Sequence, residues 1–165
     1  MMFSTGELII YGSSGVYRVI DTGNISIKGC ENRLYYTLEP VYGSGTSYVP
    51  VDTNVFMRRI MTADEANGLI DSIPNISGES FNSHSPRAIR EHYSASMKSH
   101  DSTVLIGMIK ELWEKSKRVG ISKMSRIEQQ YMEQAEDLVY GELAVSLGIE
   151  RDAVVDYIHA RLADA

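Results

Sequence analysis

Basic side chains gather in one stretch of this sequence, and their chemistry suits phosphate groups. Residues 87–126 contain nine Lys and Arg residues against four acids, a net charge of +5, whereas residues 127–165 contain two bases against nine acids, a net charge of −7. Lys and Arg bind nucleic acid largely by neutralising its phosphates. Because the whole chain carries a formal charge of −6, we expect only weak DNA binding by the protein alone. The basic stretch can touch DNA that a partner holds nearby, and the alternative interpretation is a solvated helix face.

The sequence contains no motif typical of a catalytic or metal-binding site. The histidines at positions 84, 92, 100 and 159 fall in different expected elements, and residues eight apart lie about 80° apart around a helix, so the first three share no single face. The sequence has no His-Glu-x-x-His, Cys-x-x-Cys or Gly-x-Ser-x-Gly motif. We expect no enzyme activity, no cofactor and no metal site, with the acids mostly on solvated helix faces.

The composition is that of a globular protein with one domain or two small ones. The chain has 165 residues, of which 43% are hydrophobic and 23% charged. Its longest apolar run, 104–109, is too short to span a bilayer, and the N-terminus has no signal-peptide pattern. The single cysteine, Cys30, cannot form an internal disulfide. Together these features predict a cytoplasmic protein.

The expected secondary structure changes near residue 60, from short strands to the helices that carry the basic stretch. Residues 1–60 contain short β-prone runs separated by glycine turns, with a hairpin turn at 29–32. Pro50 cannot donate to a ladder, so the last strand should end there or lie at an edge. Five short strands in so short a segment predict a small, strongly bent β-barrel of the SH3 or Tudor type. The strands are expected at 7–11, 16–20, 25–27, 33–38 and 46–51.

Residues 61–165 are predicted to form an all-α domain of about five helices, so the fold class is multi-domain α and β. Residues 77–85 are expected to be a polar linker. Trp113 follows the apolar stripe of Leu105, Ile109 and Leu112 and is expected in the core. The helices are expected to begin at the caps Thr62, Ser85, Asp101 and Ser125 and near Glu150, with Gly120 and Gly148 as terminators.

A series of short motifs runs through nearly the whole chain in a fixed order. They are Phe3-x-x-Gly6-Glu7-x-Ile9-Ile10-Tyr11, Ile27-Lys28-Gly29, Leu34-Tyr35-Tyr36-x-Leu38, Tyr48-Val49-Pro50-Val51-Asp52, Ile109-Lys110-Glu111-Leu112-Trp113, Ser125-x-x-Glu128 and Gly141-Glu142-Leu143-Ala144-x-x-Leu147-Gly148. Each motif alone is weak. Their order and spacing together resemble the CarD-like family of bacterial transcription regulators, whose N-terminal module is shared with the RNA-polymerase-interacting domain of transcription-repair coupling factor.

The resemblance implies a regulator without covalent chemistry. Its Tudor-like N-terminal module would grip the β-subunit of RNA polymerase. Its helical domain would touch promoter DNA near the upstream edge of the transcription bubble and change the stability of the open complex. Carried over by position, Ile25, Tyr48 and Val49 become candidate polymerase contacts, and Arg87, Arg90, Lys98, Lys117 and Arg118 become candidate DNA contacts.

The sequence departs from the family pattern where a DNA wedge is expected. Family members place a Trp at the start of the first basic helix as a minor-groove wedge, and Pro86 falls near that position here, with Phe81 the nearest large aromatic residue. Tyr48 stands where the family often has Arg, and position 25 holds Ile rather than a base. An alternative therefore stays open, a protein–protein adaptor of the same fold that has lost DNA wedge activity.

Overall fold

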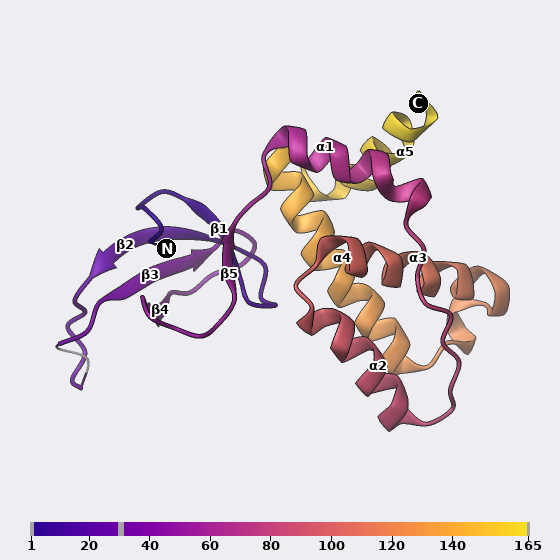
Figure 1. Ribbon diagram of the computed structural model, residues 1–165, viewed down its shortest axis with the longest axis horizontal. Helices are drawn as coiled ribbons and strands as arrows, with labels where there is room; N and C mark the ends of the chain where they lie inside the picture. The colour runs from indigo at the N-terminus through magenta and orange to yellow at the C-terminus, as the bar shows by residue number, and fades with distance from the viewer. Residues whose placement is uncertain (1, 30–31, 165) are drawn as a thin grey trace. The chain divides into compact units, whose positions relative to one another are not determined.

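The computed structural model describes residues 2–29 and 32–164, and the chain separates into two compact units, Met1–Ile60 and Met61–Ala165 (Figure 1). The first unit is built on a β-sheet and the second on helices, and each has its own cluster of buried apolar side chains. Among the described residues, no helix is both long enough and apolar enough to cross a membrane.

The first unit contains a five-stranded antiparallel sheet in the order β4-β3-β2-β1-β5. The last strand returns beside the first, which leaves β4 and β5 at the two edges, and no ladder between them closes the sheet within the described residues. The β4 strand ends at Pro50 and lies at an edge, as the sequence predicted. The strands are β1 (Leu8–Tyr11), β2 (Val16–Gly23), β3 (Tyr35–Pro40), β4 (Ser47–Pro50) and β5 (Met57–Arg59).

One strand of this unit differs from the prediction. Residues 25–27 form no strand, and the fifth strand is β5 instead. Its sequence, Met-Arg-Arg, has no β-branched residue to favour a strand. It is held by contacts with distant residues, because Arg59 Nε pairs with Glu7 Oε2 at 2.7 Å and Gly12 N–H donates to the Phe56 carbonyl at 2.7 Å. Cys30 and Glu31 of the expected hairpin turn lie outside the described residues.

The core of the sheet unit lies against one face of the sheet. Its buried members are Phe3, Ile9, Val19, Tyr36, Leu38 and Val49. The Tyr36 hydroxyl accepts a hydrogen bond from Phe3 N–H at 3.1 Å, which satisfies the polar end of this buried ring. Side chains alternate between the two faces along a strand. Burial of Val49 therefore directs its neighbour Tyr48 away from the core.

The described residues of the second unit form five helices and three short 3-10 turns, with α4 packing against each of the other four helices. The helices are α1 (Ala63–Ser72), α2 (Pro86–Lys98), α3 (Ser102–Val119), α4 (Arg126–Leu147) and α5 (Val154–Ala163). The 3-10 turns are η1 (Ile73–Asn75), η2 (Ile121–Lys123) and η3 (Arg151–Ala153). The predicted side-chain caps at Thr62, Ser85, Asp101 and Ser125 are all confirmed, as are the terminators Gly120 and Gly148, whose φ angles are 85° and 68°.

The expected polar linker between α1 and α2 is a packed strap. In Figure 1 this segment passes across α3 on its way from α1 to α2. An ideal Cβ added to Gly78 would lie 2.2 Å from the carbonyl oxygen of Gly107, so the two backbones approach too closely for a side chain. Lys110 Nζ donates to the carbonyls of Ile73 and Ile76 at 2.8 and 2.6 Å. These contacts fix the residues that lead into α2.

Candidate partner and nucleic-acid surfaces

The three candidate polymerase contacts fall into different environments. Tyr48 lies on the edge strand β4 with 47% of its surface exposed, whereas Val49 is only 4% exposed and packs in the core. Ile25 is half-buried in the loop after β2. The structure thus presents Tyr48 at the surface. It corrects the assignment of the Val49 side chain, which holds β4 against the sheet instead of meeting a partner.

The first unit has further exposed apolar side chains in the segments just before and just after β3. They belong to Ile27, Leu34, Val41 and Tyr42. Leu34 joins the strand pair through its carbonyl, which accepts from Val51 N–H at 3.0 Å. An edge strand can pair with a strand of another chain, and neighbouring apolar side chains then supply specificity. This surface therefore has the chemistry of a protein-docking edge.

Three of the candidate DNA contacts lie on one face of α2. Arg87, Arg90 and Lys98 are exposed, while Ile89 and Tyr93 point into the core. The helix begins there because Ser85 caps it and Pro86 occupies its first turn. Part of the positive charge on this face is neutralised locally, since Arg87 Nε pairs with Glu91 Oε1 at 3.0 Å. The α2 face is thus basic but already partly paired.

The other two candidate DNA contacts, Lys117 and Arg118, sit in the last turn of α3 and point in different directions. Successive helical residues are rotated by about 100°. Lys117 Nζ lies 3.7 Å from the centroid of the Trp113 ring. Arg118 instead lines a hollow beside the strap, and Phe81 and Glu114 line the same hollow. The structure therefore does not bring all five cations onto one surface.

Trp113 is not a core residue, and the expectation that it packs with the apolar stripe of α3 is wrong. Its side chain is 48% exposed, although its neighbour Leu112 is fully buried. One step of about 100° around the helix moves residue 113 to the border of the stripe. The sequence held one signal that Trp113 is exposed. Lys117 follows four residues later, and residues four apart contact each other on a helix surface.

Two lysines of the basic stretch serve the fold rather than a surface. Lys110 binds the strap carbonyls, and Lys115 Nζ donates to Glu128 Oε2 in a largely buried pair. Burial is the largest single influence on the pKa of Glu128 and acts to raise it. The hydrogen bonds from Lys115 and Ser125 outweigh it and hold the pKa below its usual value. The positive charge that residues 87–126 can offer to a ligand is therefore smaller than their net charge suggests.

Most of the described acids are exposed, as the sequence predicted, and a few exceptions serve the fold. Glu128 and Glu142 are both buried, and Glu142 Oε2 accepts the Met61 N–H at 2.8 Å, which anchors the start of the helical unit to α4. Glu111 accepts hydrogen bonds from the Tyr93 hydroxyl and from Phe81 N–H. Burial raises the pKa of Glu111 despite these bonds. These acids act as internal acceptors.

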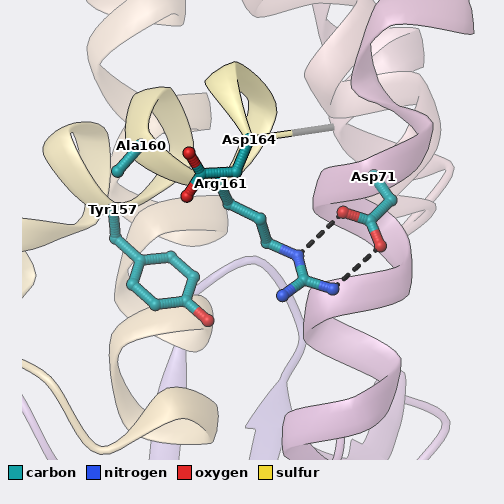
Figure 2. A pocket seen from close by; sticks show the side chains of 5 residues that line it. All are labelled: Asp71, Tyr157, Ala160, Arg161 and Asp164. Atoms are coloured by element: carbon teal, nitrogen blue, oxygen red, sulfur yellow. Dashed lines mark hydrogen bonds and ion pairs between the residues drawn. The ribbon is translucent and has the colours of Figure 1, made fainter.

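A hollow of about 520 Å³ lies between α1 and α5, and Figure 2 shows the side chains that line it. Arg161 donates to both oxygens of Asp71, at 2.7 and 2.9 Å, and this bond lowers the pKa of Asp71. The Tyr157 hydroxyl donates to Asn67 Oδ1 at 2.6 Å. Because the polar groups satisfy one another, the arrangement joins α5 to α1 and has little left to offer a ligand.

A comparison with protein families finds a match for the first unit. Residues 3–61 match the family model of the CarD-like/TRCF RID domain. No match to the chain is found among curated proteins. The matched segment includes all five strands of the sheet and the edge that carries Tyr48. The similarity of this chain to the CarD-like/TRCF RID domain therefore covers nearly the whole of its first unit.

Proposed function

We propose that this protein is a transcription regulator that binds the β-subunit of RNA polymerase through its first unit and contacts promoter DNA near the upstream edge of the bubble through its helical unit. The observation that carries the proposal is the family match over residues 3–61, because RID denotes an RNA-polymerase-interacting domain. The five-stranded sheet would be the Tudor-like module of this family, and the regulator would act without covalent chemistry.

The polymerase-binding surface is the β4 edge. Tyr48 is exposed there, and the flanking apolar residues provide area for a partner. A strand of the polymerase can add to β4 by main-chain hydrogen bonds, while Tyr48, enriched as a residue type at interface centres, supplies a large anchor. Val49 supports this edge from within the core.

DNA engagement depends on tethering. The chain is acidic overall, so its affinity for free DNA should be low. A polymerase-bound regulator holds its helical unit at a high effective concentration beside the promoter, and modest contacts then suffice. Contacts that are stronger in the open complex than in the closed one would shift the balance between the two.

An adaptor that binds polymerase without engaging DNA is the second candidate. Pro86 has a structural role at the first position of α2 and takes the place near which the family has its wedge. Phe81 cannot easily replace that wedge, because its ring stacks on His92 at 4.0 Å and meets Tyr93 edge-on at 6.0 Å. The adaptor hypothesis predicts polymerase binding with an unchanged promoter footprint.

Co-purification from the native host, with and without nuclease, tests the proposal. RNA polymerase should be retained in both samples if a direct contact holds it. Tyr48→Ala should weaken retention, and Val55→Ala is the matched control, because Val55 is equally an exposed apolar residue but precedes the opposite edge strand β5. Loss of polymerase on nuclease treatment, or equal retention by both variants, would contradict the proposed docking edge. A promoter-footprint assay with the purified complex separates the regulator from the adaptor.

A further inference from the structure

The two units of the chain are joined by a very short connection. Ile60 is the final residue of the first unit, and its N–H donates to the Leu8 carbonyl at 3.3 Å. Met61 is the first residue of the second unit, and its N–H donates to Glu142 Oε2 at 2.8 Å. Because Ile60 and Met61 are consecutive, a single peptide group separates one anchored backbone from the next. We name this peptide group the 60–61 joint.

The first unit holds its side of the joint through β5. This strand pairs with β1, and Arg59 lies opposite Ile9 in the ladder. Arg59 Nε also binds Glu7 Oε2 at 2.7 Å, so both the backbone and the side chain of this residue are held by the sheet unit. The backbone order of the first unit therefore continues as far as Ile60.

The second unit holds its side of the joint through α4 and α1. The side chain of Met61 packs against the helical core, and Glu142, which accepts its N–H, is buried in α4. Because buried polar groups are kept hydrogen-bonded, this contact holds the residue after the joint in place. Thr62 follows directly and forms the capping box of α1 with Glu65. The helical unit is therefore ordered from its first residue.

The residues around the joint are not those of a flexible linker. Boundaries between domains usually fall in exposed segments rich in Gly, Pro and polar residues. Residues 57–62 read Met-Arg-Arg-Ile-Met-Thr, without Gly or Pro, and both Ile60 and Met61 are half-buried. The connection therefore allows rotation about the backbone torsions of the joint, but it adds no free chain length between the units.

From this connection we infer that the 60–61 joint is a positioning device, which keeps the helical unit within a short reach of the partner that the first unit binds. The inference rests on the proposed function, because the reach matters only once the first unit is docked. A tethered contact is strongest when the linker suits the span and weakens as the linker lengthens. The joint therefore supplies the high effective concentration on which modest promoter contacts depend.

Amide hydrogen exchange of the full chain tests the structure of the joint. The amides of Ile60 and Met61 should both be protected, because each is hydrogen-bonded within an ordered unit. Glu142→Ala should remove the protection of Met61, whereas Glu142→Gln should keep it, since the amide oxygen of Gln still accepts a hydrogen bond. Exchange of either wild-type amide at the rate of an unstructured chain would overturn the inference.

Insertion of Gly and Ser residues between Ile60 and Met61 tests the role of the joint. Both anchors remain in place, while a flexible segment of six residues adds a mean span of about 13 Å. Polymerase retention should be unchanged, and the effect on open-complex stability should fall. Because effective concentration decreases roughly as the −3/2 power of linker length, an insertion of 24 residues should leave the promoter contact about eightfold weaker than an insertion of six.

The matched control places the same six residues between Ser13 and Ser14, at an exposed turn of the first unit, where insertions are well tolerated. It should keep both polymerase retention and the promoter effect.

The outcomes separate the joint from the proposed function. Equal promoter effects of the wild type and both joint insertions would overturn the inference and leave the proposed function intact. Loss of polymerase from the joint insertions alone would also overturn it, because docking would then require both units at a set spacing. A wild type that retains polymerase without any promoter effect would remove promoter contact from the proposed function, and with it the role inferred for the joint.

Discussion

Lys115 and Glu128 form a largely buried ion pair between α3 and α4, with side chains 13% and 6% exposed. Glu128 also closes the capping box of α4, since its other oxygen accepts from Ser125 N–H at 3.2 Å. One carboxylate thus fixes both the start of α4 and its contact with α3.

Lys115→Met should destabilise the protein by about 3–5 kcal/mol, because it leaves the Glu128 carboxylate buried without its cation. The free energy of unfolding, measured in urea, checks this expectation. Lys98→Met is the control, since Lys98 is exposed and has no ion pair in the described part of the chain. Its effect should stay within about 0.5 kcal/mol. Equal effects of the two substitutions would show that the buried pair contributes nothing specific.

The Glu128 carboxylate should make the protein more sensitive to acid. Its folded pKa lies below the unfolded value of 4.5, so the folded state binds this proton less readily than the unfolded chain. The contribution is therefore fully present above pH 4.5 and is lost as the pH falls through the lower, folded pKa. Glu128→Gln keeps the size of the side chain and should be less stable than the wild type at neutral pH, with a gap that narrows in acid. Unfolding measured between pH 6 and pH 3 tests the sign.

Glu111 should show the opposite dependence. Burial raises its folded pKa above the unfolded value of 4.5, with the bonds from Tyr93 and Phe81 acting against it. Its contribution is therefore greatest below pH 4.5 and is lost as the pH rises through the raised, folded pKa. Glu111→Gln can still accept from both donors through its amide oxygen. It should gain stability relative to the wild type as the pH increases, and a difference that is constant with pH would contradict the assignment.

The helix boundaries could be predicted from sequence because their causes are local. A capping side chain such as Ser125 bonds backbone groups two or three residues away, and Gly148 adopts a left-handed conformation that other residues avoid. The short strand β5 could not be predicted in this way. It forms only because β1 offers a partner some fifty residues earlier in the chain, and its own residues have no strand pattern.

The candidate site was only partly predictable for the same reason. Sequence marks which residues carry charge but not which charges are already paired. Lys115 and Lys110 looked like surface cations until the structure placed them against Glu128 and the strap. Trp113 looked like a core residue because it shares the apolar stripe of Leu105, Ile109 and Leu112, and the exact border of a buried stripe depends on how neighbouring helices pack.

Gly78→Ala should destabilise the strap that leads into α2. Its Cβ would meet the carbonyl oxygen of Gly107 at 2.2 Å, and a backbone atom cannot move aside as a flexible side chain can. Overpacking of this kind costs about 1–3 kcal/mol. Gly68→Ala is the matched control, because Gly68 lies within α1 and no atom lies within 4 Å of its added Cβ. That substitution should stabilise the helix by roughly 1 kcal/mol. The two melting temperatures should therefore move in opposite directions.

The attachment of α5 should depend on its buried side chains more than on its ion pair. Arg161 binds Asp71 in good geometry, but both side chains are exposed, and solvent screening leaves such a pair little net effect on stability. Ile158, in contrast, is buried among apolar neighbours, and truncation of a buried Ile to Ala costs about 2–5 kcal/mol. Ile158→Ala should therefore lower the free energy of unfolding by several times as much as Arg161→Ala. Hydrogen exchange should show faster opening of α5 in the first variant, whereas a larger effect of Arg161→Ala would mean that the α1–α5 hollow is held by charge.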